Sequence, residues 1–514
     1  MEQQILVSEE RRNNKSEGEF QRQKIEQQTV RAEEFRKVGL ASLIYAVIFT
    51  ICLYENLEGI AVCLWTAASA VYIAYTVNSY GKRLKKDSSF LMAVMLLLGV
   101  ATFCTGNPYM ICLNYLAVFI LIVSLLLHNF YDDVTWDFGK YIEEITVAAF
   151  GAVSRVGRPF GDCASFIAKK QGKPESRTRT IILGVCIAVP CIALLGGLLA
   201  AADMVFADMI SKMFANLSVP SRAIEIILML VFGFLSSYCG VSYVSARTRK
   251  EFLEKTDHGD PVLAITVTAM IAALYVAFCA IQIVYLFLGN GNLPEGITYA
   301  QYARHGFFQL LFICVLNLIL VLTIKKYFRE NHMLNVILLL LSVCTFIMTA
   351  SSAYRMILYI RAYYLTFLRA FVLVALFTIA VLMAGVLVFV LKKEFPLVKY
   401  GVVAVSTIYL VFSFCHIDAI IAKYNLTRVE NTPETVDYEY IACLSTDAAS
   451  IIHDYLSQNP ETANVILEYS GDSWVDTYLE YNRAAFEKRS FRKLNRSYDT
   501  ARKLFAEQSE GKSF

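Results

Sequence analysis

Two short stretches of this sequence combine arginine with aromatic side chains, and both have the residue types that bind anions. A guanidinium group presents a planar fork of N–H donors that matches the oxygens of a carboxylate or a phosphate. The first stretch, 298–310, predicts either a binding site of this kind or an aromatic belt at a membrane surface, where arginine reaches toward water. Its candidate site residues are Tyr299, Tyr302, Arg304, Phe307 and Phe308.

The second stretch, 354–369, supplies the other candidate site residues, which are Arg355, Tyr359 and Arg369. Arg369 lies several residues inside an apolar run, where a charge without a partner costs at least about 2.5 kcal/mol. It should therefore face the bundle interior, where it would serve a binding site; the alternatives are a structural ion pair with a nearby acid and an arginine that snorkels at a helix end. The acidic residues near apolar runs are Asp203, Asp208, Glu225 and Asp418. If the two stretches meet, they predict one electropositive pocket for an anionic head group, a phosphate-linked lipid or a peptide carboxylate.

The elements that position both stretches are membrane-spanning helices. Of the 514 residues, 57% are hydrophobic and only 18% are charged, and the charges gather in short clusters. Between the clusters lie apolar runs of about 18 residues or more, the length at which a helix crosses the hydrocarbon core. Barrel strands would be shorter and would alternate in polarity. We predict an all-α polytopic bundle with about eleven spans: 38–55, 57–77, 89–105, 109–128, 180–201, 223–245, 262–288, 306–324, 332–352, 364–391 and 399–416.

The loops of the predicted bundle alternate between basic and nearly uncharged. Basic residues gather in the even-numbered loops, which the positive-inside rule assigns to the cytoplasm. Examples are Lys85, Arg158, Arg249, Lys326 and Lys392. The amino terminus is therefore predicted in the cytoplasm and, after eleven crossings, the carboxy terminus outside. Residues 1–37 are polar and lack the apolar stretch of a cleavable signal peptide, so the first span of the domain 38–416 is expected to act as an uncleaved anchor.

The long fourth loop contains an amphipathic segment at about 139–168. Apolar residues recur there at helical spacing from Ile142 to Phe160, and charged residues take the other faces. This pattern predicts a helix in the cytoplasmic membrane interface, where the basic residues that follow meet anionic head groups. The alternative is a helix packed beneath the bundle. Pro159 is expected to end or kink the helix.

Residues 417–514 form a polar tail, which is predicted as a small extracytoplasmic helical domain with helices at 442–456 and 474–505. Residues 417–480 contain twelve acidic and two basic side chains, whereas residues 481–514 contain nine basic and four acidic ones. Either the two halves pair with each other, or the basic half leans on anionic lipid or cell-wall polymer outside the membrane.

The two stretches also resemble a known family. The pattern Tyr-Ala-x-Tyr-Ala-Arg-x-Gly-Phe-Phe-x-Leu at 299–310 is similar to the signature of the bacterial membrane family called domain of unknown function 4173, which is akin to domain of unknown function 4153. The second stretch is similar to that family's Arg-Met-x-Leu-Tyr and Tyr-Gly-Leu-Thr-x-x-Arg elements. Tyr364 stands in place of the glycine, and a close helix contact that glycine would allow is therefore not expected here. The resemblance implies a multi-pass membrane protein, typically of Gram-positive bacteria, with no established activity.

Signatures of soluble enzymes are missing, including the P-loop, the nucleophile elbow and the zinc-binding HExxH motif. The 13 cysteines and 6 histidines are scattered, so we predict no metal site and no cofactor. We expect a protein of the bacterial cytoplasmic membrane that contacts the lipid bilayer, binds no nucleic acid, and binds or transports an anionic lipid or small anionic ligand from the outer face. One alternative is a membrane-embedded enzyme on lipid-linked substrates that uses Asp203 and Asp208. The other is an envelope sensor or scaffold.

Overall fold

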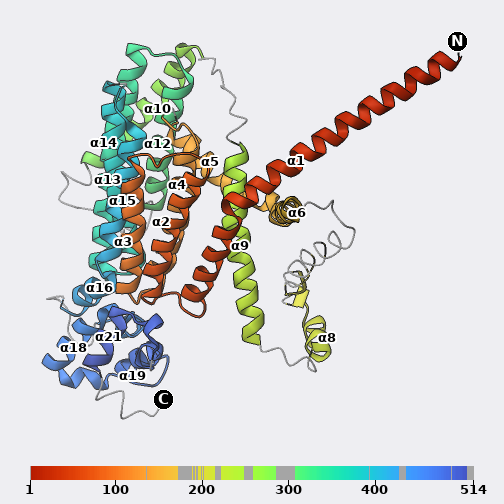
Figure 1. Ribbon diagram of the computed structural model, residues 1–514. Coiled ribbons are helices and arrows are strands. Elements are labelled where there is room, and N and C mark those ends of the chain that lie inside the picture. The colour runs from red at the N-terminus through yellow and green to blue at the C-terminus, as the bar shows by residue number, and fades with distance from the viewer. Residues whose placement is uncertain are drawn as a thin grey trace. The chain divides into compact units, whose positions relative to one another are not determined.

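The protein is described by a computed structural model (Figure 1) that covers residues 2–134, 136–171, 202–214, 221–247, 259–284, 307–392, 394–427, 436–487 and 489–505, with 184, 188, 192, 195–197 and 199–200. Over these residues the secondary structure is helical, and no strand occurs apart from two isolated bridges. The chain divides into two compact units, the first being Met1–Gly99 with Tyr115–Glu251 and the second Val100–Asn114 with Phe252–Phe514.

In the first unit, the long helix α1 packs against α2, α6 and α9. The contact is aromatic where α1, α6 and α9 meet, because the ring of Phe35 lies 5.5 Å from that of Phe166 and 6.1 Å from that of Tyr238. The helices of this unit are α1 (Glu2–Leu53), α2 (Ala61–Ser79), α5 (Phe138–Gly151), η1 (Ala152–Arg155), α6 (Arg158–Gln171), α8 (Met204–Phe214), α9 (Ser221–Arg247) and parts of α3 (Ser88–Cys104) and α4 (Pro108–Phe130).

The amphipathic segment expected as one helix at about 139–168 forms two helices, α5 and α6, with the 3-10 turn η1 between them. Pro159 lies in the first turn of α6, where its missing N–H costs no hydrogen bond, so it begins a helix rather than kinking one. α5 packs against α9, and the guanidinium of Arg247 binds the carboxylate of Glu144 through two bonds of 2.7 and 3.0 Å. One face of the segment is therefore covered by protein.

A buried carboxyl group lies where α6 packs against α9. Asp162 on α6 has no exposed surface, and its Oδ2 accepts a hydrogen bond of 2.9 Å from the hydroxyl of Tyr238. The pKa of Asp162 is raised from 3.8 to about 6, chiefly by burial and in part by Glu34, against the hydrogen bond from Tyr238 and the charges of Arg158 and Arg31, which lower it. Ionisation of Asp162 therefore lowers the free energy of unfolding.

In the second unit, α13 packs against α10, α12 and α14, and α14 packs against α15 (Figure 1). The starts of these helices follow local signals, because Asn331 caps α13 and Asp260 caps α10 directly before Pro261. The membrane helices of this unit are α10 (Pro261–Gln282), α12 (Phe307–Tyr327), α13 (His332–Tyr363), α14 (Phe367–Leu391) and α15 (Leu397–Phe414).

Nine helices among the described residues are long and apolar enough to cross a membrane, and α3 is apolar but shorter. These ten helices match ten of the eleven predicted spans, and the remaining span, 180–201, lies largely outside the described residues. One boundary differs in a way that matters for the site. α13 continues past the predicted end at 352 to Tyr363, so most of the second stretch is helical and only residues 364–366 form a turn.

The tail (residues 417–514) shares its hydrophobic core with the membrane helices. One continuous cluster runs from Met356 and Phe412 to Trp474 and Tyr478. α21 packs against α18, so the acidic and basic halves of the tail pack together. The helix predicted for 474–505 is divided, and the tail consists of α16 (Ile417–Leu426), α17 (Tyr438–Ala442), η5 (Thr446–Ala448), α18 (Ala449–Gln458), η6 (Pro460–Asn464), α19 (Trp474–Tyr481), α20 (Arg483–Phe486), η7 (Phe491–Lys493) and α21 (Arg496–Leu504).

Candidate functional site

The turn between α13 and α14 forces one residue into an unusual backbone conformation. Tyr364 has φ 68° and ψ 170°, a region that only glycine adopts readily. Tyr364 is also the position at which the resembled pattern has glycine. The backbone of the turn is thus itself sufficient reason for glycine there. A tyrosine held in this conformation costs about 1–3 kcal/mol, which the surrounding contacts must offset.

Arg369 closes this turn. One terminal nitrogen of its guanidinium donates to the backbone carbonyls of Tyr363 and Tyr364. The guanidinium carbon lies 4.2 Å from the ring centroid of Tyr359, and that ring meets the ring of Tyr363 edge-on at 5.1 Å. The last carbonyls of a helix lack partners within the helix and favour a positive charge. Arg369 therefore caps α13.

The expectation of a carboxylate partner for Arg369 is not met by the acidic residues that the sequence offered. Asp418 accepts a hydrogen bond from the amide of Ser445 at 3.0 Å, and Glu225 accepts one from the hydroxyl of Tyr54 at 3.2 Å. The carbonyls at the end of α13 take the place of a carboxylate, because they carry partial negative charge and accept hydrogen bonds from Arg369.

The tail holds the turn from its other side. The side-chain amide of Asn425 on α16 bonds both the N–H and the carbonyl of Leu365, each at 2.9 Å. The hydroxyl oxygen of Tyr440 on α17 accepts from the N–H of Phe367 at 3.0 Å. Backbone groups that follow the end of α13 are thereby satisfied by tail side chains, which ties the second stretch to the tail.

Arg355 takes part in a different contact. It lies buried on α13, and its Nη2 donates at 3.1 Å to the side-chain oxygen of Gln282, the last residue of α10. The same oxygen accepts from Ser351 at 2.6 Å. Arg355 thus joins a polar layer between α13 and α10, whereas Arg369 and Tyr359 lie together at the turn.

Most of the first stretch lies outside the described residues. Tyr299, Tyr302 and Arg304 lie outside the described residues, and Phe307 begins α12. The side chain of Phe308 is 53% exposed. A shared pocket of the two stretches remains a prediction.

A buried polar site among the described residues of the second unit was not predicted. Asp447 lies in η5 with a fully buried carboxylate, and three donors from distant parts of the chain converge on it. These are the hydroxyl of Thr105 at 2.5 Å, the amide of Gly106 at 2.8 Å and the hydroxyl of Ser497 at 2.5 Å. We call these four residues the Asp447 cluster. It joins the loop between α3 and α4 to the tail.

Two titratable residues adjoin the Asp447 cluster. Nδ1 of His416 lies 3.6 Å from Oδ2 of Asp447, and the carboxylate raises the pKa of His416 above 6.5. Burial raises the pKa of Asp418 above 3.8, and the nearby Asp447 contributes in the same direction. Arg496 is the cation that faces His416 and lowers its pKa. His416 itself has a left-handed backbone, with φ 46°.

The acidic residues proposed for an enzyme have local roles. Oδ1 of Asp203 accepts from the amides of Val205 and Phe206 at 2.7 and 3.1 Å, which caps α8. Asp208 pairs with Lys212 one turn later at 2.5 Å, and both side chains are exposed. A pair at this spacing on one helix face is an ordinary surface interaction.

No spacing rule could have revealed the Asp447 cluster, because Asp447 and Thr105 lie 342 residues apart. A weak signal was present in Thr105-Gly106-Asn107-Pro108, a run of turn-forming residues between two apolar helices. The Asn107 side chain caps the following helix by accepting from the amide of Met110 at 2.9 Å.

The helices and their apolar surfaces define a polytopic integral membrane protein. The family model described as Domain of unknown function (DUF4153) matches residues 92–455, and the chain belongs to this family. The matched range contains both arginine stretches and Asp447 but ends before Ser497. Comparison with curated proteins and with solved structures finds no match.

Proposed function

We propose that this protein is a non-catalytic sensor or scaffold of the bacterial cytoplasmic membrane, whose tail lies outside the cell and is held against the ends of the membrane helices by the Asp447 cluster. The observation that carries the proposal is the buried carboxylate of Asp447, which accepts three hydrogen bonds from the α3–α4 loop and α21. Such a carboxylate stabilises one arrangement of the tail, because its partners would be left unsatisfied in any other.

The proposal includes eleven crossings, with the amino terminus in the cytoplasm. The alternation of basic loops supports it, as do the ten helices that match predicted spans. In a cysteine-free background, an impermeant thiol reagent should label Tyr469→Cys in intact cells, because Tyr469 in the tail is 96% exposed. It should label Lys169→Cys on α6 only after the cells are opened. The reverse pattern would overturn the orientation.

Binding or transport of an anionic ligand from the outer face is the second candidate. Its support is the first stretch around Arg304, which the sequence marks as a cationic aromatic cluster. The second stretch contributes less than expected, because Arg355 and Arg369 already bind Gln282 and the end of α13. The enzyme alternative has weaker support still, given the local roles of Asp203 and Asp208. A closer relationship to domain of unknown function 4173 also remains part of the proposal.

Photo-crosslinking in native bacterial membranes tests the scaffold against the ligand-binding alternative. A crosslinking amino acid at Tyr469 or Phe491, both exposed on the tail, should yield a discrete adduct with another protein. Asp447→Ala should abolish the adduct because the tail leaves its place, and Arg304→Ala should leave it unchanged. Absence of an adduct at both positions, or an adduct indifferent to Asp447→Ala, would overturn the scaffold.

A further inference from the structure

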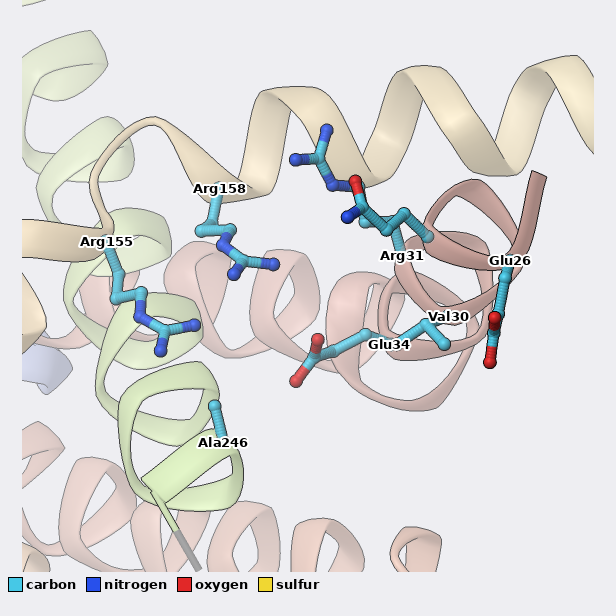
Figure 2. A pocket seen from close by; sticks show the side chains of 8 residues that line it. Glu26, Val30, Arg31, Glu34, Arg155, Arg158 and Ala246 are labelled. Atoms are coloured by element: carbon cyan, nitrogen blue, oxygen red, sulfur yellow. The ribbon is translucent and has the colours of Figure 1, made fainter. Parts of the chain in front are cut away.

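A cavity of about 410 Å³ lies within the first unit, between α1, η1, α6 and the end of α9. Three arginines from three different elements line it, which are Arg31 of α1, Arg155 of η1 and Arg158 of α6. Figure 2 shows Arg155, Arg158 and the carboxylate of Glu34 extending into the same space between the helices. The volume is that of a site for a small molecule or a lipid head group.

The three guanidinium groups have no carboxylate within ion-pair distance among the described residues. Lys169 on the same helix α6, by contrast, reaches Glu33 at 4.0 Å, and Arg247 on α9 binds Glu144 through two short bonds. Two acidic side chains, Glu26 and Glu34, also line the cavity, and Oε1 of Glu34 accepts a hydrogen bond from the hydroxyl of Ser245 at 3.1 Å. Three guanidinium groups from three elements are therefore gathered at the cavity without a direct ion pair to its carboxylates, although Arg31 and Arg158 also act electrostatically on the nearby Asp162.

Arg155 shows the same lack of an acceptor at atomic detail. Its Nη1 is closed off from solvent and has no hydrogen-bond acceptor among the described residues. The guanidinium lies 6.0 Å from the ring centroid of Tyr243, a contact that holds its direction without satisfying its N–H groups. A buried donor without an acceptor is costly, and an anionic oxygen in the cavity would remove that cost.

The surface beside the cavity is apolar. Ile142, Phe150 and Val153, on α5 and η1, are 65%, 75% and 68% exposed, and Val153 stands two residues before Arg155. Large apolar side chains exposed on an amphipathic segment are suited to the acyl boundary of a bilayer. If the segment lies in that boundary, the arginines that follow it in the chain would reach the depth of lipid phosphates.

We propose that the cavity lined by Arg31, Arg155 and Arg158 binds a phosphate group, carried either by an anionic phospholipid head group or by a free phosphorylated anion. Arginine is the residue best fitted to phosphate, because its fork donates two parallel hydrogen bonds to two oxygens. The site is distinct from the Asp447 cluster, and it does not depend on the scaffold proposal.

The test uses the full-length protein in nanodiscs. In the lipid arm, native mass spectrometry measures retention of phosphatidic acid and phosphatidylglycerol against a phosphatidylcholine background. In the free arm, inorganic phosphate is titrated into phosphatidylcholine nanodiscs and thermal unfolding is followed. Binding in the lipid arm alone supports a head-group site, and binding in the free arm alone supports a soluble anion. No binding in either arm overturns the proposal.

Variants assign the binding to the cavity. Arg155→Gln combined with Arg158→Gln should weaken binding at least about tenfold, because several charge-assisted bonds are lost. Lys169→Gln removes one positive charge from an exposed position on α6, as Arg158→Gln does from the cavity, and should leave binding unchanged. Arg158→Gln alone, in a half-buried position, gives a smaller loss and guards against misfolding of the double variant. If Lys169→Gln weakened binding as much as the double variant, the binding would depend only on general surface charge, and this result would overturn the site.

Discussion

The amide nitrogen of Gly106 lies 2.8 Å from a carboxylate oxygen of Asp447, although 341 residues separate the two in the chain. The contact joins the loop between α3 and α4 to the tail, and both residues are buried there. A Cβ atom added to Gly106 would lie 2.2 Å from the hydroxyl oxygen of Thr446. Glycine is therefore required here by the closeness of the tail.

Removal of the Asp447 carboxylate should release the tail. Asp447→Ala leaves the donors from Thr105, Gly106 and Ser497 buried without an acceptor, at a cost of about 3 kcal/mol or more. Labelling of Ala501→Cys, which is fully buried in α21, should accelerate about a hundredfold in a cysteine-free background. Asp454→Ala on α18, whose side chain is 72% exposed, is the control and should not change the rate.

Gly106→Ala should have a similar effect for a steric reason. The added methyl group overlaps Thr446 and Tyr498, so the loop and the tail must move apart. Thermal unfolding and the Ala501→Cys labelling rate measure the change. Gly240→Ala in α9 adds the same group where nothing lies within 4 Å, and it should be neutral or slightly stabilising. Equal behaviour of the two variants would contradict the close approach.

Tyr364→Gly should stabilise the protein. It removes backbone strain of about 1–3 kcal/mol, less the loss of side-chain contacts and the greater freedom of glycine in the unfolded chain, for a net gain near 1 kcal/mol. The melting temperature of the purified protein should rise. Tyr364→Ala keeps the Cβ atom and hence the strain while it loses the ring, so it should lower the melting temperature.

Acid should strengthen the docking of the tail. The pKa of His416 is raised by Asp447, so its contribution is complete below pH 6.5 and is lost as pH rises through the folded-state pKa. The raised pKa of Asp418 has the same sign, because its ionisation above its ordinary value of 3.8 penalises the folded state. Labelling of Ala501→Cys, normalised to an exposed Asp454→Cys, should therefore speed up between pH 6 and 8.5.

His416→Asn separates the contribution of His416 to the pH dependence from that of Asp418. Asparagine tolerates the left-handed backbone but does not titrate, so the pH dependence above pH 6.5 should flatten while the fold is kept. Faster labelling on acidification of the unmodified protein would contradict the assignment.

Asp162→Asn should raise stability at neutral pH. A carboxyl whose pKa rises from 3.8 to about 6 destabilises the fold by about 2–3 kcal/mol once it is ionised, and the amide oxygen of asparagine can still accept from Tyr238. The gain in melting temperature should be complete at pH 7.5 and should shrink as the pH falls from 6 toward 4. Asp132→Asn, at an exposed position, is the control.

The sequence determined the class of fold. Apolar runs of spanning length predicted ten helices that the structure describes, since hydrocarbon thickness and helix rise set that length. Arg369, which the sequence placed several residues inside an apolar run, instead lies in the first turn of α14 and binds the carbonyls at the end of α13. The division of 139–168 into α5 and α6, with Pro159 in a first turn, was wrongly anticipated as one helix, because proline permits either outcome.

Only the tertiary structure decided which groups meet. The carbonyls that bind Arg369 became available because α13 runs on to Tyr363, and helix ends depend on packing more than on periodicity. The Asp447 cluster and the cavity of Arg31, Arg155 and Arg158 each join segments far apart in the chain. Periodicity and spacing report contacts within a helix, whereas long-range partners follow from how buried surfaces fit, which no local pattern encodes.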